Sequence, residues 1–127
     1  LHIEILPIQF EEMRKQNTNE TSQHIYERVI QARKIQENRF AKFPMVRTNA
    51  MMDGGMIREM CPLDVHSEIR LKSAMNKLSL SARAYDRIIK VARTIADLDG
   101  SKEIQNQHIS ESIQYRILDR AGWGQAY

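Results

Sequence analysis

The chain is poor in the residues that stabilise disulfide-rich, metal-binding or membrane proteins. It has one cysteine in 127 residues, which excludes an internal disulfide, and we interpret Cys61 as a small buried hydrophobic residue. Its four histidines are scattered and have no cysteine pair nearby, so a zinc site is not expected. No apolar run approaches the ~18 residues of a membrane span, and no signal peptide is visible. We therefore expect a cytoplasmic protein without a bound metal or membrane contact.

Proline and glycine are also scarce, with three and five residues respectively. Hydrophobic residues make up 42% and charged residues 28% of the chain, a balance typical of globular proteins. The sequence is rich in Leu, Ile, Ala, Arg, Lys, Glu and Gln, which favours helices over strands. We predict an all-α helical bundle, preceded by a short extended N-terminal segment and one long helix.

Motifs that would indicate catalysis by this chain alone are missing. There is no Gly-x-x-x-x-Gly-Lys-Ser/Thr sequence, so nucleotide phosphates cannot be held by a Walker A loop, and Gly54-Gly55 is too short to replace one. No Ser/His/Asp or Cys/His constellation stands out. The net charge of +3 permits an anionic partner but does not require one.

The N-terminal third predicts a strand, a connection and a long helix. Residues 1–5 alternate apolar and polar side chains, as a short strand does, and they start without a methionine, which suggests a piece of a longer protein. Residues 9–20 are polar and predict a flexible connection. Thr21 or Ser22 can cap a helix that runs to about Phe40. Its narrow apolar stripe consists of Ile25, Val29, Ala32, Ile35 and Phe40.

Two further helices are predicted on either side of the most regular segment. Residues 47–55 form a loop, and residues 56–61 a short helical turn. Asp64 can cap a helix to about Leu78, with Val65, Ile69, Ala74 or Met75, and Leu78 facing inward. The last helix covers about residues 106–118. We expect Ile109 and Ile113 to be buried in it and His108 to be exposed in its first turn.

Residues 80–98 give the clearest pattern, a helix with one apolar and one basic face. Ser81 can cap it, and Gly100 can end it in a left-handed conformation. The basic side carries Arg83, Arg87 and Lys90. The positions expected to be buried follow i, i+3, i+4, i+7 spacing; they are Tyr85, Ile88, Ile89, Ala92, Ile95 and Ala96.

This helix resembles the sensor-2 helix of AAA+ ATPases. The resemblance rests on Ser81-Ala82-Arg83 followed by the run from Ile88 to Leu98, and it continues from Ser101 to Arg116. It points to the magnesium-chelatase-like family, and within it to the bacterial competence-associated branch. It implies that residues 1–20 hold the end of the nucleotide-binding core and a linker, 21–60 the long helix and a loop, and 61–120 the helical lid. Residues 121–127 form a tail without a match.

The resemblance also implies the chemistry of the site. Arg83 corresponds to the sensor-2 arginine that contacts the terminal phosphate of a nucleotide, with Ser81 as its helix cap, and Arg87 and Lys90 are candidates for phosphate or interface contacts. The parent protein would bind ATP with Mg²⁺ and hydrolyse it in a hexameric ring. The missing core or a neighbouring subunit would complete the site. The competence-associated branch acts on DNA, whereas the chelatase branch acts on a porphyrin and magnesium.

Two alternatives remain open. The chain could be the lid of a true magnesium chelatase subunit, or a stand-alone basic helical module that binds nucleic acid. Acidic residues interleave with the basic ones, which weakens the second alternative, and Arg93–Asp97 is read as an ordinary surface pair. The basic residues that would contact phosphates are Arg28, Arg33, Lys34, Arg39, Lys42, Arg87 and Lys90.

Overall fold

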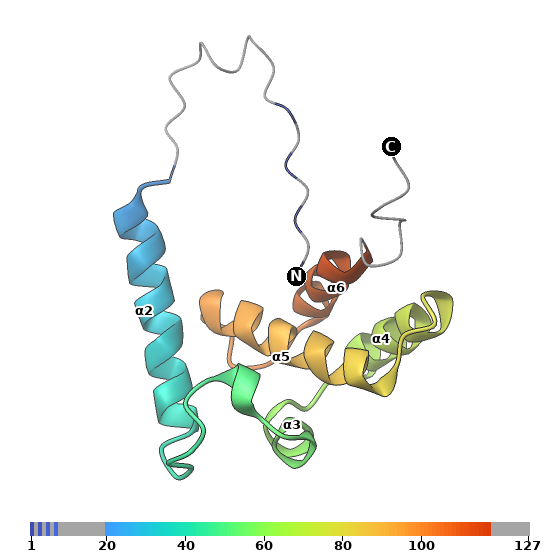
Figure 1. Cartoon of the computed structure of the whole chain (residues 1–127), viewed down its shortest axis with the longest axis horizontal. Coiled ribbons are helices and arrows are strands. Elements are labelled where there is room, and N and C mark those ends of the chain that lie inside the picture. The colour runs from blue at the N-terminus through green and yellow to red at the C-terminus, as the bar shows by residue number, and fades with distance from the viewer. Residues whose placement is uncertain (2, 4, 6, 8–19, 118–127) are drawn as a thin grey trace, which may run out of the picture.

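The computed structural model describes residues 1, 3, 5, 7 and 20–117. The described residues form five α-helices and a 3-10 helix, and none of them lies in a strand (Figure 1). The all-helical prediction is confirmed. No helix in this described part is long and apolar enough to cross a bilayer. The elements are α2 (Ser22–Arg39), η1 (Asn49–Met51), α3 (Gly54–Met60), α4 (Val65–Lys77), α5 (Ala82–Leu98) and α6 (Asn106–Ile117).

Several predictions at the chain ends fall wholly or partly on residues that are not described. Of the predicted strand at residues 1–5, the structure describes Leu1, Ile3 and Ile5. These three residues are exposed and form no strand. Residues 8–19, which include most of the predicted connection, lie outside the described part. So do Leu118, the expected end of the last helix, and the tail at 121–127.

Side-chain caps fix where the helices begin. Thr21 accepts a hydrogen bond from the His24 N–H at 3.3 Å, Asp64 from the Ser67 N–H at 2.6 Å and Ser81 from the Ala84 N–H at 3.3 Å. Each satisfies a donor in the first turn that has no partner inside the helix. These three caps were predicted from the sequence and are confirmed.

The fourth cap was missed, and it corrects the prediction for residues 47–61. The Asp53 carboxylate accepts a hydrogen bond from the Met56 N–H at 2.9 Å. As a result α3 begins at Gly54, two residues before the expected turn. The preceding segment is not all loop either, because it contains η1.

Two helices end in the same way, with one residue in the left-handed region. After α5, Gly100 has a φ of 67°, and the Ser101 N–H reaches back to the Ala96 carbonyl at 2.8 Å. After α4, Ser79 has a φ of 44°, and the Leu80 N–H reaches the Met75 carbonyl at 2.9 Å. These are Schellman ends, in which the last carbonyls of the helix find donors. The left-handed glycine was predicted; the left-handed serine was not.

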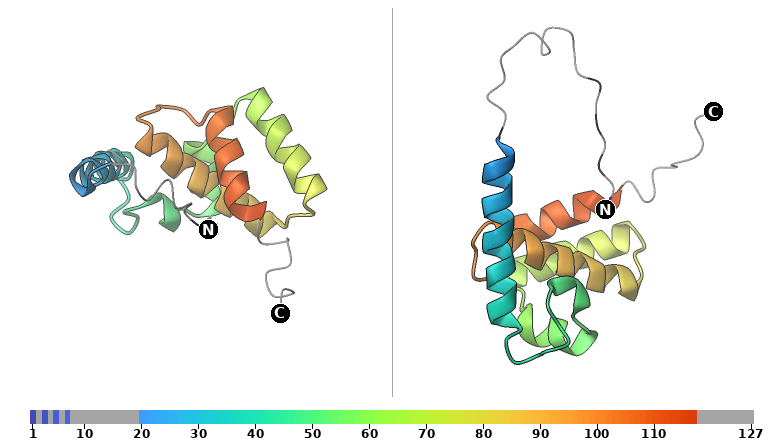
Figure 2. Two further views of the ribbon diagram at one scale, coloured as in Figure 1. Left: turned by 90° about the horizontal axis from the view of Figure 1, so that it is seen from above. Right: turned by 60° about the vertical axis from the view of Figure 1, so that its left-hand side comes forward.

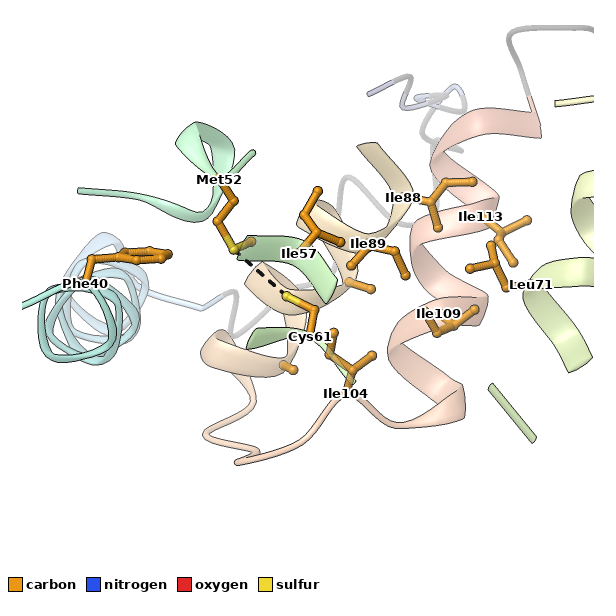
Figure 3. Packing of buried hydrophobic residues seen from close by; sticks show 12 residues of the cluster. Phe40, Met52, Ile57, Cys61, Leu71, Ile88, Ile89, Ile104, Ile109 and Ile113 are labelled. Atoms are coloured by element: carbon orange, nitrogen blue, oxygen red, sulfur yellow. Dashed lines mark hydrogen bonds between the residues drawn. The ribbon is translucent and has the colours of Figure 1, made fainter. Parts of the chain in front are cut away.

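Helix α5 lies at the centre of the fold. It packs against α6, α2, η1 and α3, while α4 packs against α6, so α4 and α2 lie near opposite ends of α5 (Figure 1, Figure 2). Ile88, Ile89 and Ile109 are fully buried where α5 meets α6, as the helical spacing predicted. Figure 3 shows that the core continues through Cys61 and Met52 toward Phe40.

Cys61 is a buried core residue, as predicted, with its Sγ 4.0 Å from the Met52 Sδ. Burial raises the pKa of the Cys61 thiol, although the nearby charges of Arg93 and Arg39 act in the opposite direction. A thiol held protonated in this way is a poor nucleophile.

The predicted inner faces of α4 and α5 need correction at their edges. On α4, Val65 and Ile69 are 67% and 60% exposed, and Ser67 and Leu71 are buried instead. The inward face therefore starts with Ser67 and Leu71, whereas the predicted Ala74, Met75 and Leu78 do pack against the core. On α5, Tyr85 is 37% exposed and Ile95 is half-buried, since both lie at the margin of the packed arc.

Only the C-terminal half of α2 is packed. Ala32, Gln36 and Phe40 are buried, whereas Ile25 and Val29 are 44% and 41% exposed. The predicted apolar stripe is thus real in its second half and exposed in its first half. Helix α2 stands along one side of the bundle as a consequence (Figure 2).

Candidate functional site

The start of α5 presents the residue that the sequence singled out. Ser81 caps the helix, and Arg83 follows in its first turn with an exposed side chain. No hydrogen bond or ion pair joins Arg83 to any other residue that the structure describes. An arginine in this position presents five N–H donors in a fixed fork, which suits a phosphate group. Its guanidinium is available to a ligand or a partner surface.

Two more basic residues continue along α5 from Arg83. Arg87 is exposed, and Lys90 is half-buried and donates a hydrogen bond from Nζ to the Ala50 carbonyl at 3.0 Å. Spacings of four and three residues place Arg83, Arg87 and Lys90 on one side of the helix. The predicted basic face of α5 is therefore present, and Lys90 is anchored on η1.

The opposite side of α5 holds the helix in place. Ala84, Ile88, Ile89, Ala92 and Ala96 are buried on it. A helix fixed by full side-chain burial has little freedom to rotate about its axis, because core packing is dense. The orientation of the basic face is set by this apolar contact.

Buried charges complete the attachment of α5 to α2. The Asp97 carboxylate accepts hydrogen bonds from both Nη atoms of Arg39, from Asn49 Nδ2 at 2.7 Å and from Arg93 Nε at 3.1 Å. Arg93 also donates to the carbonyls of Lys102 and Ser101, at 3.0 and 2.7 Å. Asp97 and Arg93 are 2% and 3% exposed.

The Asp97 cluster corrects two interpretations of the sequence. Arg93 and Asp97 form a buried ion pair and not a surface pair. Arg39 is not part of a phosphate-binding surface, because its guanidinium forms an ion pair with Asp97. Burial alone would raise the pKa of Asp97, but hydrogen bonds from Arg39 and Asn49 and the charges of Arg39 and Arg93 outweigh it and lower that pKa. Its donors and acceptors are matched inside the protein, so the cluster is structural.

A helical wheel contained part of the signal for this burial. Arg93 lies four residues after Ile89 and falls beside the apolar stripe. Asp97 lies seven residues after Lys90, which puts it on the basic side of the helix, so the wheel did not indicate its burial. What the sequence did not show was the partner on α2, which lies 58 residues from Asp97 along the chain.

His108 is the other polar residue whose location was predicted wrongly. It is 2% exposed, because its Nδ1 accepts the Gln105 N–H at 3.0 Å and its Nε2 lies 3.2 Å from Asp99 Oδ2. The His108 side chain thus accepts a backbone N–H just before α6, as the third residue of a capping box does. Within the described residues no three His, Cys, Asp or Glu side chains converge in a way that could hold a metal ion.

Comparisons with known proteins found a family and relatives that match most of this chain. The family model described as magnesium chelatase, subunit ChlI C-terminal, matches residues 19–116. The chain is 42% identical over 108 residues to the competence protein ComM of Haemophilus influenzae, covering 83% of this chain and 20% of that protein. It is 41% identical over 101 residues to the uncharacterized protein YifB of Escherichia coli, covering 80% of this chain and 19% of that protein. The chain therefore spans about a fifth of the length of the curated relatives it matches.

Proposed function

This chain belongs to the family of the magnesium chelatase subunit ChlI C-terminal domain, and we propose that it forms the helical lid of an AAA+ ATPase. The rest of the parent protein would supply the phosphate-binding loop that this sequence lacks. The relatives are about five times as long as the matched segment, which leaves room for such a core. The observation that carries the proposal is Arg83, exposed in the first turn of a helix whose other face is locked into the core.

In this proposal Arg83 stabilises negative charge on the nucleotide and forms no covalent bond. Phosphoryl transfer spreads negative charge over the oxygens of the γ-phosphate, and a fixed guanidinium stabilises that charge. The contact is made to a nucleotide bound by the core of the same subunit or of its neighbour in a ring. Because α5 is held by α2, η1, α3 and α6, a pull on Arg83 would move the lid as a unit, which couples hydrolysis to lid rotation.

In the parent protein, Mg²⁺ would bind together with ATP, and we propose that residues of the core would hold it. The work done by hydrolysis is proposed to involve DNA, because similarity to a competence protein favours that branch. The stand-alone nucleic-acid-binding alternative loses support in the structure. One of the basic side chains that it needs on α2, Arg39, is held against the buried Asp97, and a second, Arg28, pairs with Glu20 at the surface.

The test is the Arg83→Ala substitution in the full-length parent. We expect ATP turnover to fall by a factor of ~10³, the scale of losing an arginine that stabilises phosphoryl-transfer charge. The melting temperature of the 127-residue chain should hardly change, because substituting an exposed residue usually changes the free energy of unfolding by less than ~0.5 kcal/mol. The matched control is Arg33→Ala, at an exposed arginine on α2. Full ATPase activity in Arg83→Ala would refute the sensor-2 role.

A further inference from the structure

A groove runs between α4 and α6, which lie side by side (Figure 2). Its volume is about 610 Å³, within the ~300–1,000 Å³ typical of ligand sites. Neither the role proposed for Arg83 nor the Asp97 cluster uses it. The two helices are joined by Leu71 of α4 and by Ile109 and Ile113 of α6, which are buried against one another (Figure 3). Because dense packing leaves the helices little room to shift, the groove keeps its shape.

The α4 wall of the groove is basic. His66, Arg70 and Lys77 line it and are exposed. Their spacings of four and seven residues place all three on one face of the helix. Neither Arg70 nor Lys77 forms an ion pair with any residue that the structure describes. This wall therefore presents positive charge that an anionic ligand would neutralise.

The α6 wall carries hydrogen-bonding groups. Asn106, Ser110 and Gln114 line it at intervals of four residues, so they follow one another along one side of the helix. The two amides each offer donors and an acceptor. Among the described residues Asn106 Oδ1 is buried and has no hydrogen-bond partner, which is rare in folded proteins. A ligand N–H would satisfy this acceptor once the amide turns toward the groove.

The spacing and chemistry of the α6 wall favour an extended peptide. Residues four apart on a helix lie ~6 Å apart along its axis, and every second residue of an extended chain recurs at ~6.6–6.8 Å. A peptide backbone offers both N–H donors and carbonyl acceptors. A DNA backbone offers acceptors, as phosphate and sugar oxygens. The basic α4 wall adds that the peptide is acidic, since carboxylates are the ordinary partners of Arg and Lys in proteins.

We propose that the groove between α4 and α6 binds an extended acidic peptide segment of a partner protein. Carboxylates of the segment pair with Arg70 and Lys77, and its backbone bonds to the amides of Asn106 and Gln114. Alternate side chains point the other way and rest on Ile69, which also lines the groove. The lining covers about three turns of α4, ~16 Å, which accommodates about five extended residues. The proposal does not rest on the lid role, because every residue it uses belongs to this chain.

The experiment titrates the isotopically labelled 127-residue chain in low-salt buffer and follows backbone amide shifts by NMR. The probe is a hexapeptide with blocked ends in which Glu alternates with Val. A matched peptide carries Lys in place of Glu, and an oligothymidylate is the nucleic-acid probe. The groove variants are Gln114→Ala and the double substitution Arg70→Gln with Lys77→Gln. The matched control removes the same charge from exposed positions of α2, by Arg33→Gln with Lys34→Gln.

We expect saturable shifts at residues 66–77 and 106–114 with the Glu peptide, and no saturable binding of the Lys peptide. The double groove variant should bind the Glu peptide about tenfold more weakly, the combined scale of two exposed ion pairs, and its binding should depend less on salt. Gln114→Ala should weaken binding by ~2–10-fold, the scale of one hydrogen bond, and leave the salt dependence unchanged. The α2 control should bind as the unmodified chain does.

Four results would overturn the proposal. Shifts that never saturate with the Glu peptide would show that no site exists. Equal binding of the Glu and Lys peptides would show that the basic wall does not select the ligand, and an equal loss in the α2 control would show that only net charge matters. Tighter binding of oligothymidylate at the same residues, unaffected by Gln114→Ala, would assign the groove to nucleic acid. None of these results measures ATP hydrolysis, so this proposal and the lid role can fail separately.

Discussion

At the residue scale, Asp97 determines more of the structure than its position in the sequence suggests. The residue is 2% exposed, and its carboxylate accepts hydrogen bonds from two arginines and an asparagine. Removing one partner from a buried ion pair costs about 3–5 kcal/mol, because the other charge stays buried without compensation. Here the uncompensated charges would be Arg39 and Arg93.

We therefore predict that Asp97→Asn lowers the free energy of unfolding by ~3–5 kcal/mol, measured by urea denaturation. The control is Glu103→Gln, which removes the same charge from an exposed position and should cost less than ~0.5 kcal/mol. Equal, small losses in both variants would mean that the buried cluster contributes nothing.

The same residue gives a pH dependence of known sign. The pKa of Asp97 is lowered in the folded state, whereas the unfolded chain titrates near the ordinary value of ~3.9. The stabilisation is therefore complete above about pH 5 and is lost as the pH falls past the unfolded-state value and through the lower, folded-state pKa. The difference in stability between the unmodified chain and Asp97→Asn should be constant near neutral pH and shrink in acid. A difference that stays constant down to acid unfolding would contradict this assignment.

At the scale of the helices, α5 supplies the surface on which the others assemble. Ile89 is fully buried, so Ile89→Ala should destabilise the chain by ~2–5 kcal/mol, the usual cost of emptying a packed isoleucine site. Thermal and urea unfolding measure it. Val65→Ala is the matched control on α4, because Val65 is 67% exposed, and it should cost little. Comparable effects of the two substitutions would mean that the phase of these helices has been assigned wrongly.

The ends of α4 and α5 provide an opposed pair of substitutions. Both end with a residue at positive φ, Ser79 and Gly100, but a side chain in this region costs ~1–2 kcal/mol that glycine avoids. Ser79→Gly should stabilise the chain by ~0.5–1 kcal/mol after allowing for the greater freedom of unfolded glycine. Gly100→Ala should destabilise it by ~1 kcal/mol, although its new Cβ meets no atom within 4 Å. Shifts of the same sign in both variants would argue against the backbone explanation.

At the scale of the whole molecule, the chain holds one part of the proposed ATP site and lacks the phosphate-binding loop. We predict that the isolated 127-residue chain does not hydrolyse ATP and shows no tight ATP binding in calorimetry with Mg²⁺. Tight binding or turnover by the isolated chain would contradict the lid assignment.

The sequence by itself determined the local structure of this protein. Spacing at three and four residues located α2, α4, α5 and α6, and the caps at Thr21, Asp64 and Ser81 fixed where three of them begin. These signals are reliable because a helix turn and its cap involve only residues a few positions apart. The exposure of Arg83 also followed from its place on the wheel, whereas its role came from the resemblance and remains a proposal.

Only the tertiary structure decided which polar residues are buried. Arg39, Arg93 and His108 were all expected at the surface, and the fold encloses each of them with a partner. A polar group can be buried only when hydrogen bonds or opposite charges compensate its lost hydration. For Asp97 that compensation comes from Arg39, 58 residues away in the sequence.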